Sequence, residues 1–396
     1  MTVITPTAVH RRMPIALGAC LLSFATFWIA QRAAHVSMID LLVYRAEGAT
    51  VRAGGDLYAL RATAAQLPAT YPPFAALLFT PLTLLDTGSL RTLATAGNLA
   101  LLVVFVRLSL RIVGHARVET VWWASAVVVW CEPVWTTLRY GQVNLLLAVL
   151  VLWDLSRRPG DRWAGVGIGL AAAVKLTPAL FAVFLLATGV VAYRRHRKGP
   201  WLRHARVAAG SFVWATLLAA AVLPYDSWRF WTDVVFRTDR AGHAEETANQ
   251  ALRGVLARLL HTPDPGALWT AVAALVTAVG LAVAVRAELR GERAWAVVCC
   301  AVTALLVSPV SWSHHWVWCV PLVVLLTARA RRAVAAGTLL VFCSYALWWV
   351  PHTPGRPELH QNPVEFTLSG LYAATGCLVL ALAASSAGRR QAVTNE

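Results

Sequence analysis

Long, unbroken apolar stretches recur along the whole chain, separated by shorter polar segments. The first, MPIALGACLLSFATFWIA (Met13 to Ala30), is long enough to cross a bilayer as a helix, and comparable stretches continue to about residue 386. Lipid offers no partners for backbone hydrogen bonds, so spanning segments are helices or closed barrels. Unbroken rather than alternating runs favour helices. The pattern therefore predicts an all-α polytopic membrane protein.

Composition supports this class, because 58% of the 396 residues are hydrophobic and only 14% are charged, against about 25% charged in soluble domains. The net charge of +16 could suggest a nucleic-acid partner, but most of the 35 Lys and Arg residues stand at the ends of apolar runs. These clusters lie at residues 11–12, 107–117, 157–162, 194–206, 286–293, 329–332 and 389–390. By the positive-inside rule they mark cytoplasmic loops beside anionic lipid headgroups, and no nucleic-acid partner is expected.

Placing the arginine clusters inside the cell orders the chain into about twelve transmembrane helices with both termini cytoplasmic. The predicted spans lie near residues 13–31, 91–112, 119–131, 141–156, 163–175, 178–193, 205–223, 267–286, 294–309, 315–328, 333–350 and 367–386. The stretch TYPPFAALLFTPLTLL (Thr70 to Leu85) is apolar but short and bounded by prolines, which indicates a re-entrant or interfacial segment. No repeat or linker is visible, so residues 1–396 are predicted to form one membrane domain.

This order gathers the unusual polar residues on the outer face of the membrane. They fall in segments near 37–74, 131–144, 175–178, 224–266 and 308–318. Ionisable groups that border a membrane are costly and are functional candidates for that reason. The sequence therefore predicts a polar pocket that opens to the outside.

Asp40, directly after the first span, has two interpretations of about equal weight. Ser37-x-x-Asp40 fits a capping box, in which Asp40 only stabilises the start of an interfacial helix. Alternatively Asp40 is a catalytic carboxylate, with Tyr44 and Glu47 behind it on the same helical face. The two roles are compatible, because a helix N-terminus keeps a carboxylate ionised.

The other candidates also have structural alternatives. Glu132 and Lys175 could merely pair or reach toward the interface, and this reading is favoured by composition alone. His314 and His315 stand among tryptophans and could anchor an aromatic belt. Adjacent residues on a helix point about 100° apart, so two neighbouring histidines are a poor metal pair. The seven cysteines lack CxxC spacing and are expected to be small buried hydrophobes.

Seven stretches together resemble one family, the actinobacterial polyprenyl-phosphomannose-dependent α-1,2-mannosyltransferases. These are integral-membrane GT-C glycosyltransferases that include the enzyme extending phosphatidylinositol mannosides. The stretches are IDLLVYRAEG, DLY, TYPPFAALLF, EPVWTTLRYGQVN, VKLTPAL, NQALRG and SPVSWSHHWVW, and they run in the family's order from residue 39 to 318. In the family an aromatic and an acidic residue precede YGQ, whereas this chain has Leu138 and Arg139 there, a departure that bears on the acceptor more than on the chemistry.

The resemblance implies a GT-C fold in the cell membrane, with an active site that faces the periplasm. It implies a polyprenyl-phosphate sugar donor, a lipid-anchored glycan acceptor and an aspartate that acts as catalytic base, which matches Asp40. The family's histidine matches His314 or His315. No metal or other cofactor is expected, because cationic side chains can stabilise the phosphate leaving group.

The remaining candidates divide between the two substrates. Lys175, Arg253 and His315 are the expected ligands of the donor phosphate. The expected contacts of the sugars and the acceptor are Tyr44, Tyr71, Glu132, Gln142, Asn144, Asn249 and Gln250. Gln142 and Asn144 could instead cap the span that follows them.

Three functions remain open from the sequence. The favoured one is inverting transfer of mannose to a lipid-anchored glycan in phosphatidylinositol mannoside or lipomannan synthesis, forming an α-1,2 linkage. A polyprenyl-phosphate-arabinose-dependent arabinosyltransferase makes the same chemical demands. A transporter or flippase for a lipid-linked sugar is disfavoured, because its paired halves with broken helices are not visible here.

Overall fold

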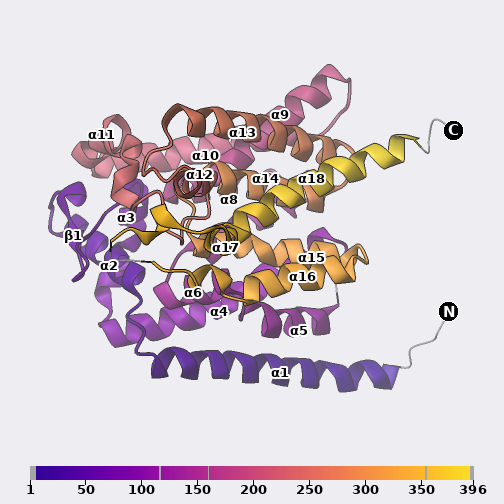
Figure 1. Ribbon diagram of the computed structural model, residues 1–396, viewed down its shortest axis with the longest axis horizontal. Helices are drawn as coiled ribbons and strands as arrows, with labels where there is room; N and C mark the ends of the chain where they lie inside the picture. Colours follow the sequence, from indigo (N-terminus) through magenta and orange to yellow (C-terminus); the bar gives the residue numbers. More distant parts are fainter. Residues whose placement is uncertain (1–5, 116, 159, 353–354, 393–396) are drawn as a thin grey trace.

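A computed structural model describes residues 6–115, 117–158, 160–352 and 355–392. These residues are predominantly helical, as the apolar runs predict, and the helices pack into an elongated bundle (Figure 1). The α-helices are α1 (Pro6–Ala33), α2 (Ile39–Arg52), α3 (Pro73–Phe79), α4 (Thr87–Ile112), α5 (Val118–Val128), α6 (Glu132–Tyr140), α7 (Asn144–Leu155), α8 (Val166–Val174), α9 (Ala179–Arg194), α10 (Trp201–Val222), α11 (Pro224–Thr232), α12 (Leu252–Leu259), α13 (Gly266–Leu289), α14 (Arg293–Val307), α15 (Cys319–Ala328), α16 (Arg332–Cys343), α17 (Pro363–Ser369) and α18 (Leu371–Ala392). Two short antiparallel strands, β1 (Arg61–Ala62) and β2 (Leu67–Pro68), pair Arg61 with Pro68 and Ala62 with Leu67.

Four helices in the described part of the chain are long and apolar enough to cross a membrane. They are α4, α10, α13 and the part of α1 from Met13 to Ala33. The number reaches six if the bent pairs α6–α7 and α17–α18, with bends of 118° and 66°, each form one span. The prediction of about twelve spans is therefore not confirmed. Helices do form at the other predicted positions, but they have nine to sixteen residues, and at 1.5 Å per residue a helix of that length falls short of a hydrocarbon layer of about 30 Å.

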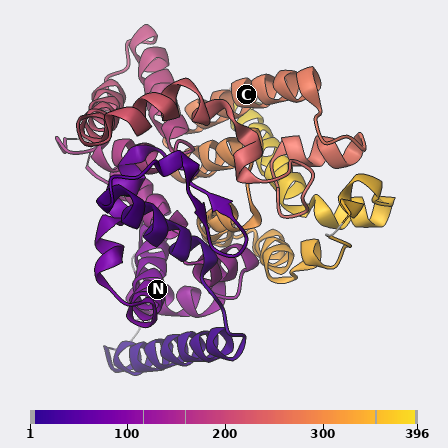
Figure 2. The same ribbon diagram turned by 90° about the vertical axis from the view of Figure 1, so that its left-hand side faces the viewer.

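The short elements collect at one end of the bundle. There α2, α3, the β1–β2 strands and α11 lie together, while α1 begins and α18 ends at the opposite end (Figure 1). Figure 2 shows this end face-on, with segments from the first, middle and last thirds of the chain side by side. The contacts include the Leu57 amide donating to Asp226 and an ion pair between Arg356 and Glu245.

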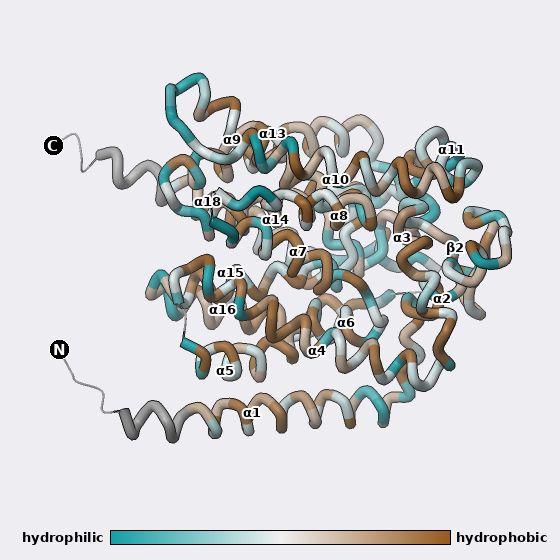
Figure 3. The backbone as a smooth tube through the Cα atoms, turned by 180° about the vertical axis from the view of Figure 1, so that it is seen from behind, coloured by the Kyte–Doolittle hydropathy of each residue, from teal (hydrophilic) through white to brown (hydrophobic). Residues whose placement is uncertain are grey.

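Apolar side chains fill the space between the helices. Hydrophobic positions dominate the helices, and hydrophilic positions concentrate in the turns that connect them (Figure 3). Small residues allow the closest approach, as where α8 crosses α10. There a Cβ on Gly169 would lie 2.3 Å from the carbonyl oxygen of Ala208, so only glycine fits this crossing. This packing fixes the end of α8, which Lys175 follows.

Candidate active site

A cavity of about 640 Å³ opens at the end of the bundle where the short elements gather. Its wall is built from α2, the segment 67–72, the α6–α7 turn, the start of the α8–α9 connection, the segment 230–248, the turn at 308–315, and Trp348, His352 and Glu358. Seven of the predicted site residues line it together: Asp40, Tyr44, Tyr71, Gln142, Lys175, His314 and His315. Glu47, behind Asp40 on α2, lines it as well. Segments far apart in the sequence thus converge on one polar pocket.

Asp40 does not cap α2, so the capping-box interpretation is wrong. The N-cap position belongs to Met38, in the left-handed region at φ 52°, and no side chain caps the helix. Asp40 is the second residue of the helix, and its Oδ2 accepts a hydrogen bond from Nε2 of Gln142 at 2.6 Å. The carboxylate therefore faces the cavity wall rather than its own helix terminus.

Gln142 is held in place by an unusual backbone turn. Gly141 ends α6 in the left-handed conformation at φ 70°, and a Cβ there would lie 2.7 Å from Cβ of Leu41 on α2. Only glycine allows both the conformation and the approach. The Gln142 Oε1 then accepts hydrogen bonds from the hydroxyls of Tyr44 at 2.7 Å and Tyr71 at 3.2 Å. With both ends of its amide engaged, Gln142 orients the Asp40 carboxylate.

Two carboxyl groups on α2 have pKa values pushed apart by their surroundings. Burial raises the pKa of Asp40 to about 6, although the Gln142 hydrogen bond and the charge of Lys175 both lower it. Burial and the neighbouring Asp40 charge raise the pKa of Glu47 to about 8. At neutral pH Asp40 is therefore ionised and Glu47 is protonated. A split of this kind identifies Asp40 as the available proton acceptor.

Lys175 and His315 lie together in the cavity, where burial lowers the pKa of Lys175 to about 7, although the Asp40 charge raises it, and burial and the Lys175 charge lower the pKa of His315 well below its usual value, so that His315 is neutral. The Lys175 Nζ lies 2.8 Å from Nε2 of His315, 3.3 Å from Oδ1 of Asn144 and 3.4 Å from the Tyr71 hydroxyl. His315 Nδ1 accepts the Trp312 backbone N–H at 3.2 Å, so the proton of the neutral ring resides on Nε2. Two nitrogens that both carry hydrogens then face each other, and an anionic oxygen placed between them would satisfy both.

His314 occupies a different position from its neighbour. Its carbonyl oxygen accepts hydrogen bonds from the Asn144 amide at 3.0 Å and the Thr137 hydroxyl at 2.8 Å. Its Nε2 is buried and has no hydrogen-bond partner among the described residues. The structure thus places His315, not His314, against Lys175, while both rings line the cavity.

Four predicted residues do not reach this cavity. Glu132 is fully buried and accepts hydrogen bonds from Ser313, Trp348 and Tyr372, so it joins α6 to three later segments. The other three are Asn249, Gln250 and Arg253.

Asn249 and Gln250 form hydrogen bonds with backbone groups instead. Asn249 Oδ1 accepts the Ser311 N–H at 3.0 Å, and Gln250 Nε2 donates to the Ser369 carbonyl at 2.6 Å. Arg253 donates to the hydroxyl of Thr238 at 2.7 Å. Asn144 does not line the main cavity, but together with Lys175 and His315 it lines a small adjoining cavity of about 50 Å³. These four residues therefore stabilise the segments that form the cavity wall.

Several cavity residues were not predicted. They are Tyr140, Arg237, Arg240, Glu246, Thr247, Trp312, Trp348, His352 and Glu358. For Arg237, Arg240, Glu246 and Thr247, the only signal in the sequence is the polar density of RTDRAGHAEET (Arg237 to Thr247) in a long loop. No local pattern distinguishes Trp348, His352 and Glu358 from other polar or aromatic residues near a span end.

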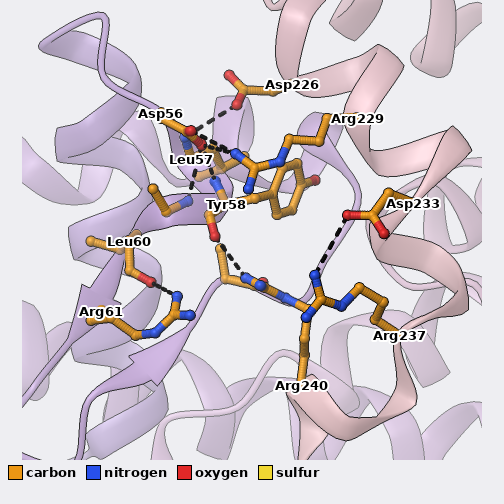
Figure 4. A network of polar contacts seen from close by, with 12 residues as sticks. Asp56, Leu57, Tyr58, Leu60, Arg61, Asp226, Arg229, Asp233, Arg237 and Arg240 are labelled. Atoms are coloured by element: carbon orange, nitrogen blue, oxygen red, sulfur yellow. Dashed lines mark hydrogen bonds and ion pairs between the residues drawn. The ribbon is translucent and has the colours of Figure 1, made fainter.

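A network of arginines and aspartates borders the cavity (Figure 4). Arg229 on α11 donates to both carboxylate oxygens of Asp56, and Asp226 accepts the Leu57 N–H, which ties α11 to the segment after α2. Arg240 donates to the carbonyl oxygens of Tyr58 and Ala69. These contacts fix the wall formed by segment 230–248.

Fold and cavity together define a helical membrane protein with carboxylate and cationic groups gathered in one polar pocket. Residues 69–309, more than half of the chain, match the model of Glycosyltransferase family 87. The chain belongs to this family and is a glycosyltransferase. The resemblance drawn from its sequence motifs is thereby confirmed.

Similar proteins from mycobacteria align with most of the chain. The polyprenol-phosphate-mannose-dependent alpha-(1-2)-phosphatidylinositol mannoside mannosyltransferase of Mycobacterium tuberculosis is 37% identical over 302 residues, which are 72% of this chain and 68% of that protein. The protein of the same name from Mycolicibacterium smegmatis is 36% identical over 80% of this chain and 76% of its own. A Mycobacterium tuberculosis protein named for the pentamannoside is 34% identical over 85% of this chain and 77% of its own.

Among solved structures, ArnT from Cupriavidus metallidurans bound to undecaprenyl phosphate aligns with 98% of this chain and 79% of its own. The TM-score is 0.45 and the sequence identity 14%. A likeness at this level carries no argument about the site.

Proposed function

We propose that this glycosyltransferase transfers mannose from a polyprenyl-phosphate mannose to a hydroxyl of a lipid-anchored glycan, with inversion, on the periplasmic face of the membrane. The α-1,2 linkage and the phosphatidylinositol mannoside class of acceptor follow from the names of its relatives. The observation that carries the chemistry is the cavity in which the oriented Asp40 carboxylate lies with the Lys175–His315 pair. Membership of a glycosyltransferase family favours an enzyme over a transporter.

In this mechanism Asp40 accepts the proton of the acceptor hydroxyl as its oxygen attacks the anomeric carbon. The bond between that carbon and the phosphate oxygen breaks, and the polyprenyl phosphate leaves with the bonding electrons. General-base catalysis of this type contributes about 10²–10⁴-fold. Gln142 holds the carboxylate in the position that the attack requires, since its amide is fixed by Tyr44 and Tyr71.

The leaving phosphate needs cations more than a protonating acid, because a phosphate monoester anion is already stable. Lys175 Nζ and His315 Nε2 supply hydrogens at one point in the cavity, where a phosphate oxygen replaces their mutual contact at 2.8 Å. Charge-assisted bonds of this type are among the strongest in proteins. Arg253 does not line the cavity and donates to the hydroxyl of Thr238, a residue of the cavity wall, so its part in this proposal is to support that wall.

The test is transfer by the purified protein in nanodiscs, with polyprenyl-phosphate mannose and a series of phosphatidylinositol mannosides, followed by linkage analysis of the product. We expect an α-1,2-linked mannose in the product. Asp40→Asn should reach the membrane in normal amount and bind donor, yet lose at least about 100-fold in rate, since an amide accepts no proton. Near-normal turnover by this variant would overturn Asp40 as the base, and transfer of arabinose in place of mannose would overturn the donor.

A further inference from the structure

A second polar region lines the cavity apart from Asp40 and the Lys175–His315 pair. It is formed by Glu246 and Thr247, from the loop before α12, and by Glu358, from the short 3₁₀ turn Pro357–His360. The rings of Trp312 and Trp348 line the same cavity. The mechanism proposed above uses none of these side chains.

Glu358 is the most informative of them. Its residue is only 2% exposed and borders the cavity. Its carboxylate interacts electrostatically with the buried Arg258, but no described residue forms a hydrogen bond or a close ion pair with it. The hydroxyl of Thr247, a residue 1% exposed, is fully buried and has no hydrogen-bond partner in the described chain. Buried polar groups are almost always hydrogen-bonded, and leaving one unsatisfied is costly. A ligand that enters the cavity would satisfy both groups.

The charge of this region selects the kind of ligand. Burial first, and then the charges of Glu358 and Glu245, raise the pKa of Glu246, although the His243 N–H that donates to Glu246 Oε1 lowers it. Two carboxylates disfavour a phosphate, which belongs with Lys175 and His315, and favour donors such as vicinal sugar hydroxyls. Indole rings complete the set, because their faces pack against the C–H groups of a sugar ring. An uncharged, hydroxyl-rich ligand therefore fits.

The size of the cavity leaves room for such a ligand beside the reacting groups. Its volume of about 640 Å³ lies well inside the range of about 300–1,000 Å³ that is typical of sites for drug-sized molecules. A donor sugar and the acceptor sugar that it joins occupy the region near Asp40. The wall with Glu246 and Glu358 is then available to the next sugar of the acceptor.

We propose that Glu358, Glu246 and Thr247, with Trp312 and Trp348, form a second sugar subsite that binds the acceptor residue next to the one being glycosylated. The carboxylates accept hydrogen bonds from its hydroxyls, and the indole rings pack against it. This inference rests on the proposed function. It means that the enzyme selects acceptors with at least two sugars, and that the selection is made away from the reacting atoms.

The test compares synthetic acceptors that carry one mannose or two α-1,2-linked mannoses on the same lipid anchor. We expect the wild-type kcat/KM to be at least about tenfold higher for the two-sugar acceptor, the gain of one or two charge-assisted hydrogen bonds. Glu358→Gln and Glu246→Gln should each reduce this preference about tenfold, because an amide oxygen accepts less strongly and its NH₂ group cannot accept. Both changes preserve side-chain size. If the Glu358→Gln variant does not accumulate, the Glu246→Gln variant still tests the subsite, because Glu246 is only half-buried.

Glu365→Gln is the matched control, since this glutamate lies on α17 outside the cavity and completes a capping box that glutamine also supports. It should keep the wild-type preference. Equal kcat/KM for the two acceptors in the wild type, or an equal loss for both acceptors in the two variants, would overturn the subsite. Calorimetric titration with free α-1,2-mannobiose and mannose gives a readout that does not require transfer. Tighter binding of mannobiose that Glu358→Gln abolishes supports the subsite even if mannose transfer itself fails, and equal binding of the two sugars refutes it.

Discussion

At the scale of single residues, the amide of Gln142 connects the groups on which the proposed chemistry depends. It donates to Asp40 and accepts from Tyr44 and Tyr71, so the carboxylate cannot rotate freely. Electrostatic interactions also connect Asp40 with the proposed phosphate site. Lys175 contacts His315 and at the same time lowers the pKa of Asp40. The base and the phosphate site are therefore coupled, and a change in one should be measurable in the other.

This coupling predicts the pH dependence of transfer. The pKa of Asp40 is about 6, and a base must be ionised, so kcat/KM should fall by about tenfold for each pH unit below that value. In Lys175→Gln the residual kcat/KM should have its midpoint at higher pH, because the positive charge that lowers the Asp40 pKa has been removed. A pH–rate profile of both proteins from pH 4.5 to 8 checks this. A midpoint near the ordinary aspartate value of about 4, or a downward shift in the variant, would contradict it.

At the scale of elements, the α6–α7 turn determines where Gln142 lies. Gly141 reverses the chain in the left-handed region and lets α6 approach α2 at Leu41. The segment is a bent pair of helices with an angle of 118° between them, and the bend places polar side chains from both halves near the cavity. A break of this kind in an apolar stretch is tolerated where it borders a polar cavity.

Gly141→Ala should therefore damage activity more than stability. The new Cβ would lie 2.7 Å from Leu41, and a displacement of Gln142 by about 1 Å can cost about 10²-fold in rate. Gly54→Ala is the control, because Gly54 also has a positive φ of 67° but no atom within 4 Å of a Cβ. Both variants should lose about 1–3 kcal/mol of stability from backbone strain, and Gly141→Ala should lose more because Leu41 must also shift. Only Gly141→Ala should lose the larger part of its transfer rate, and similar rates in the two variants would contradict the role of the turn.

At the scale of the whole molecule, one end of the bundle contains the cavity and the other contains the start of α1 and the end of α18 (Figure 1). Arginine-rich turns, such as the one after α9, lie away from the cavity (Figure 1). The positive-inside rule predicts that these turns are cytoplasmic. The proposed periplasmic site requires this polarity, because a polyprenyl-phosphate donor presents its sugar at one surface of the membrane.

Cysteine labelling of intact cells checks the orientation. On a background without the seven native cysteines, Asp239→Cys, beside the cavity and exposed, should react with a membrane-impermeant maleimide from outside. Arg195→Cys, in the exposed turn after α9, should react only after the membrane is permeabilised. The reverse pattern would place the cavity in the cytoplasm and overturn the proposed topology.

The sequence by itself determined the class, the helical fold and the family, because apolar runs and ordered motifs are local properties that can be read along the chain. It also identified the core of the candidate site, since Asp40, Gln142, Lys175 and His315 stand in motifs or at span ends where polar groups are costly. The predicted number of spans is not confirmed, because an apolar run does not reveal whether a helix continues through it or bends, as at Gly141.

Only the tertiary structure decided which polar side chains face the cavity. Asn249 and Glu132 looked equivalent to Gln142 in sequence, yet they are fully buried and bonded to neighbouring segments. Conversely, Glu358 reaches the cavity although no local pattern predicts it, and for Glu246 the only signal is the polar density of its loop. The direction of a side chain depends on the rotation of its element and on partners more than a hundred residues away, and neither is encoded in the spacing of residues along the chain.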